Sequence, residues 1–136
     1  MALTGIHHVA IVVADLDDAA TRYSRVLGSE PVKIRDVPQS KLTLAFYAVG
    51  DSFIELICPY GEDDSYDFPG FLARRGEAIH HVAVDVDDLD ESISALKRRE
   101  VCLLSDEPTV GPDDRIVFVA EEMLNGVSLE LVERTS

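Results

Sequence analysis

The sequence contains the same thirteen-residue segment twice, and this internal repeat limits the folds that are open to the chain. Residues 6–18, IHHVAIVVADLDD, align with residues 79–91, IHHVAVDVDDLDE, at a constant offset of 73, and nine of the thirteen positions are identical. A match that includes a shared His-His and a shared Asp-Leu-Asp indicates two copies of one supersecondary unit. Two copies predict a pair of related modules rather than a solenoid, because a solenoid needs more repeats to bury its faces.

Each copy has the pattern of a strand followed by a helix. The β-branched runs Val9–Val13 and Val82–Val86 predict strands. Asp15 and Asp88 follow these runs, and each has an acidic residue three positions later, which is typical of a helix N-terminus. The first helix is expected to end at Gly28, since glycine favours the conformation that terminates helices.

Three short strands are predicted after each helix, so each module has the order βαβββ. These strands are expected at residues 31–34, 42–49, 52–57, 101–104, 116–119 and 127–132. Gly50-Asp51 and Asn125-Gly126 mark turns between them. We therefore expect an α+β fold with a single domain over residues 1–136: module one at 5–57, a connection at 58–77 with a helical turn at 71–75, and module two at 78–133.

The charge of the chain excludes some classes of partner. The sequence has 12 basic and 26 acidic residues, for a net charge of −14, which disfavours binding to nucleic acid or to an anionic membrane surface. We expect no transmembrane helix and no signal peptide, because no apolar run is long enough to span a membrane and residues 1–5 lack a basic and an apolar region. The two cysteines lack the spacing of a disulfide scaffold. We therefore expect a cytoplasmic protein with no nucleic-acid or membrane partner. An anionic ligand would need a local basic patch, for which the candidates are Lys33, Arg35, Lys41, Arg74 and Arg75.

A histidine pair near the start of each module and a glutamate near its end are the candidate chemical groups. Glu55 and Glu130 each stand inside an apolar strand, where a carboxylate is costly unless it is paired or bound to a cation. Two imidazoles and two carboxylates suit zinc or another divalent first-row metal. Because side chains alternate along a strand, only one histidine of His7-His8 and one of His80-His81 can face a given side. The repeat indicates the same choice in both pairs but leaves open which one. Any one of these residues alone is commonly structural, whereas the symmetric set favours a metal.

The chain resembles the vicinal oxygen chelate superfamily, which includes glyoxalases and bleomycin resistance proteins, over nearly its whole length. It is most similar to the methylmalonyl-CoA epimerase family, through residues 71–81 (FLARRGEAIHH), Val49-Gly50-Asp51 and Glu107-Pro108. The resemblance implies two βαβββ modules in a pseudo-two-fold arrangement that forms a metal-binding cleft. It also selects the second histidine of each pair, so the implied metal ligands are His8, Glu55, His81 and Glu130.

The same resemblance implies an activity. It predicts a homodimeric, metal-dependent epimerase that acts through an enolate on methylmalonyl-CoA or a related 2-substituted acyl-CoA, with Co, Mn, Ni or Zn as the divalent ion. The family uses two carboxylate bases; one corresponds to Glu130, and Gln39 stands where the other is expected. A glutamine amide cannot accept a proton at neutral pH, so Gln39 puts inversion of the substrate in question. The alternatives are a glyoxalase I-like lyase or another enolate-forming enzyme on the same fold, and a non-catalytic small-molecule binding protein.

Overall fold

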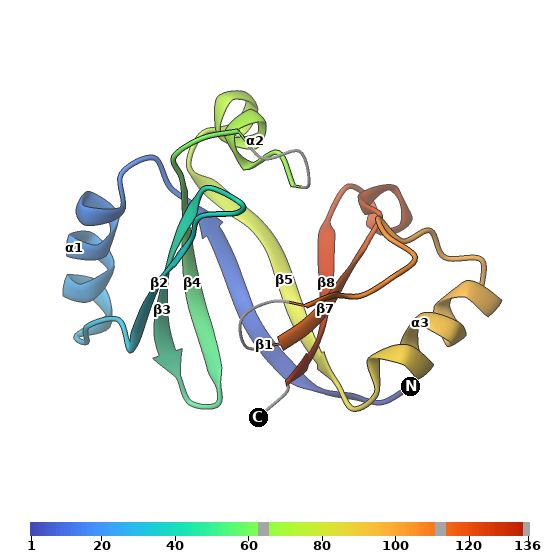
Figure 1. Cartoon of the computed structure of the whole chain (residues 1–136). Coiled ribbons are helices and arrows are strands. Elements are labelled where there is room, and N and C mark those ends of the chain that lie inside the picture. Colours follow the sequence, from blue (N-terminus) through green and yellow to red (C-terminus); the bar gives the residue numbers. More distant parts are fainter. Residues whose placement is uncertain (63–65, 111–113, 135–136) are drawn as a thin grey trace. The chain divides into compact units, whose positions relative to one another are not determined.

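The computed structural model describes residues 1–62, 66–110 and 114–134, and this part of the chain has the order βαβββ twice (Figure 1). The elements are β1 (Leu3–Val12), α1 (Leu16–Leu27), β2 (Lys33–Val37), β3 (Leu42–Val49), β4 (Ser52–Pro59), α2 (Phe68–Arg75), β5 (Ala78–Val86), α3 (Leu89–Arg98), β6 (Thr109–Val110), β7 (Asp114–Val119), the 3-10 helix η1 (Glu121–Leu124) and β8 (Ser128–Arg134). The predicted α+β class is therefore confirmed. Among the described helices, none is long and apolar enough to cross a membrane.

The chain forms two compact units. Unit 1 consists of Met1–His8 and His81–Ser136, and unit 2 consists of Val9–His80. The boundaries fall inside β1 and β5, so each of these two strands contributes residues to both units. The predicted connection at 58–77 belongs to unit 2, and its residues 63–65 lie outside the described residues.

In unit 2, the strands β2, β3, β4 and the last residues of β1 are neighbours in that order. β3 is antiparallel to both β2 and β4, and its Phe46 lies opposite Glu55. Helix α1 packs against β3 and β4, where the Tyr47 hydroxyl donates a 3.0 Å hydrogen bond to the Ala20 carbonyl. Two apolar clusters stabilise this unit, one containing Phe68 and Phe71 of α2 and the other containing Ala19 of α1.

In unit 1, the strand order is β1, β5, β8, β7 and β6. β8 runs parallel to β5 and antiparallel to β7, which in turn is antiparallel to β6. Helix α3 buries Leu89, Ile93 and Leu96 against an apolar cluster that includes Val117 and Leu131. This packing fixes β7 and β8 next to the strand that carries His81.

Helices α1 and α3, which follow the first strand of each module, start in the same way. The Asp15 carboxylate accepts a 3.0 Å hydrogen bond from the backbone N–H of Asp18, and the Asp88 carboxylate accepts one of the same length from Glu91. Gly28 ends α1 at a φ of +69°, in the left-handed region that glycine tolerates without strain. The predicted starts of both helices and the end of the first are confirmed.

Other predicted boundaries differ from the structure. The strand predicted at 101–104 is wrong: this segment makes only an isolated bridge between Leu103 and Val119, and β6 forms further along the chain. The reason is local, because the backbone N–H of Val101 bonds back to the carbonyl of Leu96 and extends the end of α3. The predicted turn at 71–75 is the second half of α2, which starts earlier because the Asp67 carboxylate caps Gly70. The strand predicted at 31–34 begins two residues later, as β2.

Candidate metal centre

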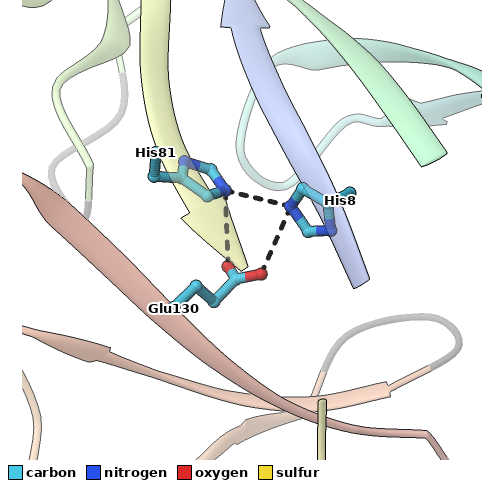
Figure 2. A group of neighbouring side chains, drawn as sticks. All are labelled: His8, His81 and Glu130. Carbon is cyan, nitrogen blue, oxygen red and sulfur yellow. Dashed lines mark hydrogen bonds and ion pairs between the residues drawn. The ribbon is translucent and has the colours of Figure 1, made fainter. Parts of the chain in front are cut away.

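Three strands of unit 1 bring three candidate ligands together. His8 lies on β1, His81 on β5 and Glu130 on β8. The parallel register of β5 and β8 places Ala83 opposite Glu130. Because side chains alternate along a strand, His81 therefore projects from the same face of the sheet as Glu130. Figure 2 shows the two imidazoles and the carboxylate pointing toward one another.

The three side chains are close and buried. The Nε2 atoms of His8 and His81 are 3.0 Å apart. The Glu130 carboxylate lies 3.4 Å from His8 Nε2 through Oε1 and 3.9 Å from His81 Nε2 through Oε2. All three residues are at most 5% exposed. A carboxylate and two imidazoles are thus packed around one point with little access for bulk water.

This spacing fits a divalent metal ion. Ligand atoms at about 2.0–2.1 Å from a zinc-like ion stand roughly 2.9–3.4 Å from one another in octahedral or tetrahedral geometry. The separations of 3.0 and 3.4 Å fall in this range, and the third, at 3.9 Å, needs a small adjustment of one side chain. Nitrogen and carboxylate donors are also the types that zinc and first-row divalent ions prefer. The group could therefore hold a divalent metal ion.

The environment keeps His8 neutral. Burial, together with a smaller effect of the neighbouring His7, lowers the pKa of His8 from 6.5 to about 3. The nearby Asp85 acts in the opposite direction, but its carboxylate is held by Arg134 at 2.9 and 3.0 Å, and Arg134 itself lowers the pKa. His8 is therefore neutral in the physiological pH range, and a neutral imidazole keeps one ring nitrogen with a lone pair that can bind a metal.

The first histidines of the two pairs have different surroundings. His7 Nδ1 lies 2.7 Å from His8 Nδ1, and its Nε2 lies 3.5 Å from the Asp114 carboxylate. His80 instead packs between Phe68 and Phe71 in unit 2, with ring centroids 4.7 and 4.8 Å away. The structure thus brings together the second histidines of the pairs, whereas the first histidines are not equivalent.

Two further predicted site residues belong to unit 2. Glu55 is buried in β4, opposite Phe46. Gln39 is exposed in the turn between β2 and β3. The role of Glu55 as the fourth ligand and that of Gln39 in place of a base stay predictions. Of the residues around the three ligands, Asp114 gave no signal in the sequence, because its contact with His7 arises only when β1 and β7 join one unit.

Comparisons with known proteins show the family of the chain. A model of the Glyoxalase/Bleomycin resistance protein/Dioxygenase superfamily matches residues 7–118. The chain belongs to this superfamily. The fold and the family that the sequence predicted are thereby confirmed.

Individual members of the superfamily are similar over nearly the whole chain. The chain is 33% identical to an ethylmalonyl-CoA/methylmalonyl-CoA epimerase of Cereibacter sphaeroides, over 93% of this chain and 95% of that protein. The crystal structure of methylmalonyl-CoA epimerase from Mycobacterium tuberculosis superposes with a TM-score of 0.89 at 34% identity, covering 98% of this chain and 90% of the other. A substituted Streptomyces coelicolor methylmalonyl-CoA epimerase, in complex with 2-nitronate-propionyl-CoA, has a TM-score of 0.91 at 30% identity, covering 99% and 97%.

Proposed function

We propose that this member of the superfamily is a metal-dependent epimerase that acts on methylmalonyl-CoA or a related 2-substituted malonyl-type thioester. The observation that carries the proposal is the buried group of His8, His81 and Glu130. The substrate class comes from the relatives, which are named as epimerases of such thioesters and match this chain over nearly the full length of both proteins.

The reaction needs removal of an acidic proton between two carbonyl groups. In a malonyl-type thioester the α-carbon lies between a carboxylate and a thioester, so loss of its proton gives an enolate. A divalent ion held by the group would supply a Lewis acid that binds two neighbouring oxygens of the substrate and stabilises the charge of the enolate. We expect Co, Mn, Ni or Zn, since the donors are imidazole nitrogens and carboxylate oxygens.

The residues of the chain have separate tasks in this scheme. His8 and His81 are neutral donors, and the His81 ring is held in place by an edge-to-face contact with Phe118, whose ring centroid is 5.0 Å away. Glu130 is the carboxylate at the group, and we assign it the second task of moving the α-proton at one of its oxygens. General-base catalysis of this kind contributes about 10²–10⁴-fold to a rate.

Inversion also requires a proton donor on the opposite face of the substrate. The family resemblance puts Gln39 where this second group is expected, and a glutamine amide cannot supply the proton. Inversion by this chain therefore needs another acid, such as Asp36, or water as the donor. Glu55 is proposed as the fourth ligand. A homodimer, which the family resemblance implies, and a cytoplasmic location, which the sequence predicts, stay predictions.

The proposal is tested by measuring metal content and proton exchange on the same protein. Elemental analysis should find about one divalent ion per chain, and NMR in D₂O should show deuterium entering the α-position of methylmalonyl-CoA. Glu130→Gln should reduce this exchange by about 10²-fold or more. The matched control is Glu122→Gln, at an exposed glutamate of η1, which should exchange at the wild-type rate.

Two outcomes would contradict the proposal. Metal-free protein without exchange activity would favour a non-catalytic binding protein. Turnover of the hemithioacetal of methylglyoxal and glutathione, without exchange on any acyl-CoA, would favour the lyase alternative.

A further inference from the structure

The geometry points to His7 and Asp114 as positioning residues that hold His8 in a single tautomer, with its Nε2 lone pair directed at His81 and Glu130. The inference rests on the proposed metal function, since it concerns how one ligand is prepared for an ion. It concerns two residues that do not themselves belong to the candidate ligand group.

The first step is the contact between the two imidazoles. His7 Nδ1 and His8 Nδ1 are 2.7 Å apart, a hydrogen-bond distance, so one of the two nitrogens carries the proton between them. If His7 donates, His8 must carry its own proton on Nε2, which points at His81 and blocks metal binding. If His8 donates, its Nε2 keeps the lone pair and faces His81 Nε2 at 3.0 Å.

The second step is the carboxylate of Asp114, which favours the second of these two arrangements. It lies 3.5 Å from His7 Nε2. A carboxylate only accepts hydrogen bonds, so it favours the tautomer of His7 that carries its proton on Nε2. In that tautomer, His7 Nδ1 is an acceptor, and the proton between the rings belongs to His8. The order Asp114, His7, His8 therefore favours a free Nε2 lone pair on His8. The Glu130 carboxylate, 3.4 Å from that nitrogen, acts in the opposite direction, because it favours a proton there in metal-free protein. In this inference the preference set by Asp114 and His7 prevails.

Burial makes this preference stronger. The His7 side chain is 8% exposed and that of His8 is 5% exposed, so water competes little for the contact between them. Partners that orient the far side of a ligating imidazole affect metal affinity by about 10–100-fold. His80, the counterpart of His7 in the repeat, packs between Phe68 and Phe71 and so provides an internal comparison.

The decisive test is the tautomer of His8 in metal-free wild-type protein. Long-range ¹H–¹⁵N NMR on protein labelled in its histidines distinguishes a protonated Nδ1 from a protonated Nε2. We expect His8 to carry its proton on Nδ1. A proton on His8 Nε2 in the wild type would overturn the inference, whether or not the protein binds metal.

Variants test the effect on affinity. His7→Leu removes the acceptor and should weaken Co²⁺ binding, followed by visible absorption, by about 10–100-fold. His7→Asn keeps a side-chain oxygen near the position of Nδ1 and should recover most of that loss. Asp114→Asn removes the charge and should mix the two tautomers of His8 in the NMR spectrum. His80→Leu is the matched control and should change the affinity by less than about threefold.

The results separate this inference from the proposed function. Equal Co²⁺ affinity in wild type and in folded His7→Leu would overturn the positioning role and leave the metal site standing. Absence of Co²⁺ binding to the wild type would overturn the proposed function, and the tautomer of His8 would still decide the inference.

Discussion

The Nε2 atoms of His8 and His81 lie 3.0 Å apart, although 73 residues separate them in the chain. The two histidines are counterparts in the internal repeat, so duplication of one strand has placed two identical donors at a common point. Glu130 adds a carboxylate from the last strand of the second copy, 3.4 Å from His8. An internal repeat of this kind supplies equivalent ligands to one site from both modules, and no additional sequence motif is needed.

Loss of His81 should remove metal binding. His81→Ala deletes one of the three grouped donors, and we expect the affinity for Co²⁺ or Zn²⁺ to fall by at least about 100-fold, since even outer contacts to a ligand are worth 10–100-fold. Isothermal titration calorimetry measures this directly. His80→Ala serves as the neighbouring control, and wild-type affinity in His81→Ala would remove the residue from the ligand set.

Gln39→Glu should change the outcome of the reaction more than its rate of exchange. If Gln39 takes the place of a second base, wild-type protein exchanges the α-proton of its substrate faster than it inverts the centre. A carboxylate at this position provides an acceptor of suitable pKa, so inversion should rise toward the rate of exchange. Deuterium incorporation and chiral analysis on the same samples give both rates. Equal rates in the wild type, unchanged by Gln39→Glu, would assign the second base to another residue such as Asp36.

The salt dependence of kcat/KM for an acyl-CoA substrate should report the electrostatic potential that the substrate meets as it approaches the protein. The chain carries a net charge of −14 and coenzyme A is polyanionic, so long-range repulsion slows their encounter. Screening at higher ionic strength should leave kcat/KM unchanged or increase it. A steep fall of kcat/KM with salt would instead show that a basic patch dominates, and the candidates for it are Lys33, Arg35, Lys41, Arg74 and Arg75.

Stability should decrease in mild acid, in part through His80. Burial lowers the pKa of His80 to about 4, from 6.5, and the charge of Arg75 acts in the same direction. Between these two values, the unfolded chain binds a proton that the folded chain does not. The contribution of His80 is therefore complete above pH 6.5 and is lost as the pH falls toward 4.

A variant isolates this contribution. His80→Phe keeps a ring between Phe68 and Phe71 but cannot titrate. Urea unfolding at pH 7 and pH 5 should show that the wild type loses about 1 kcal/mol more than the variant, a figure reduced for the partial exposure of His80. The same loss in both proteins would show that His80 is not responsible.

The two aspartates that begin α1 and α3 should contribute similarly to stability. Asp15→Ala and Asp88→Ala each remove a 3.0 Å hydrogen bond to a helix N-terminus. Each change should lower the free energy of unfolding by about 1 kcal/mol. Asp15→Asn and Asp88→Asn keep an accepting oxygen and should lose much less. Denaturant unfolding of the four variants checks this, and a loss as large in the asparagine variants would point to charge rather than capping.

The sequence by itself determined the order of the elements. The repeat, the β-branched runs and the aspartates before each helix led to two βαβββ modules, because these patterns act through local backbone preferences and hydrogen bonds. They failed at 101–104, where the Val101 N–H continues the end of α3 and leaves the segment with an isolated bridge. Beyond Val101, the bridge rests on two backbone hydrogen bonds, from the Leu104 N–H to the Phe118 carbonyl and from the Ala120 N–H to the Cys102 carbonyl. No pattern of residue types distinguishes such a single bridge from a longer strand.

Only the tertiary structure decided which atoms of the candidate site meet. Because side chains alternate along a strand, His7 and His8 project from opposite faces, and nothing in the sequence itself favoured one over the other. The alternation does not tell which of the two faces meets the other ligands. The register of β5 with β8 placed Glu130 near His81, and the pairing of strands in unit 1 gave His7 the contact with Asp114. These contacts join residues far apart in the chain, and their geometry depends on how strands pair and pack, which local sequence does not encode.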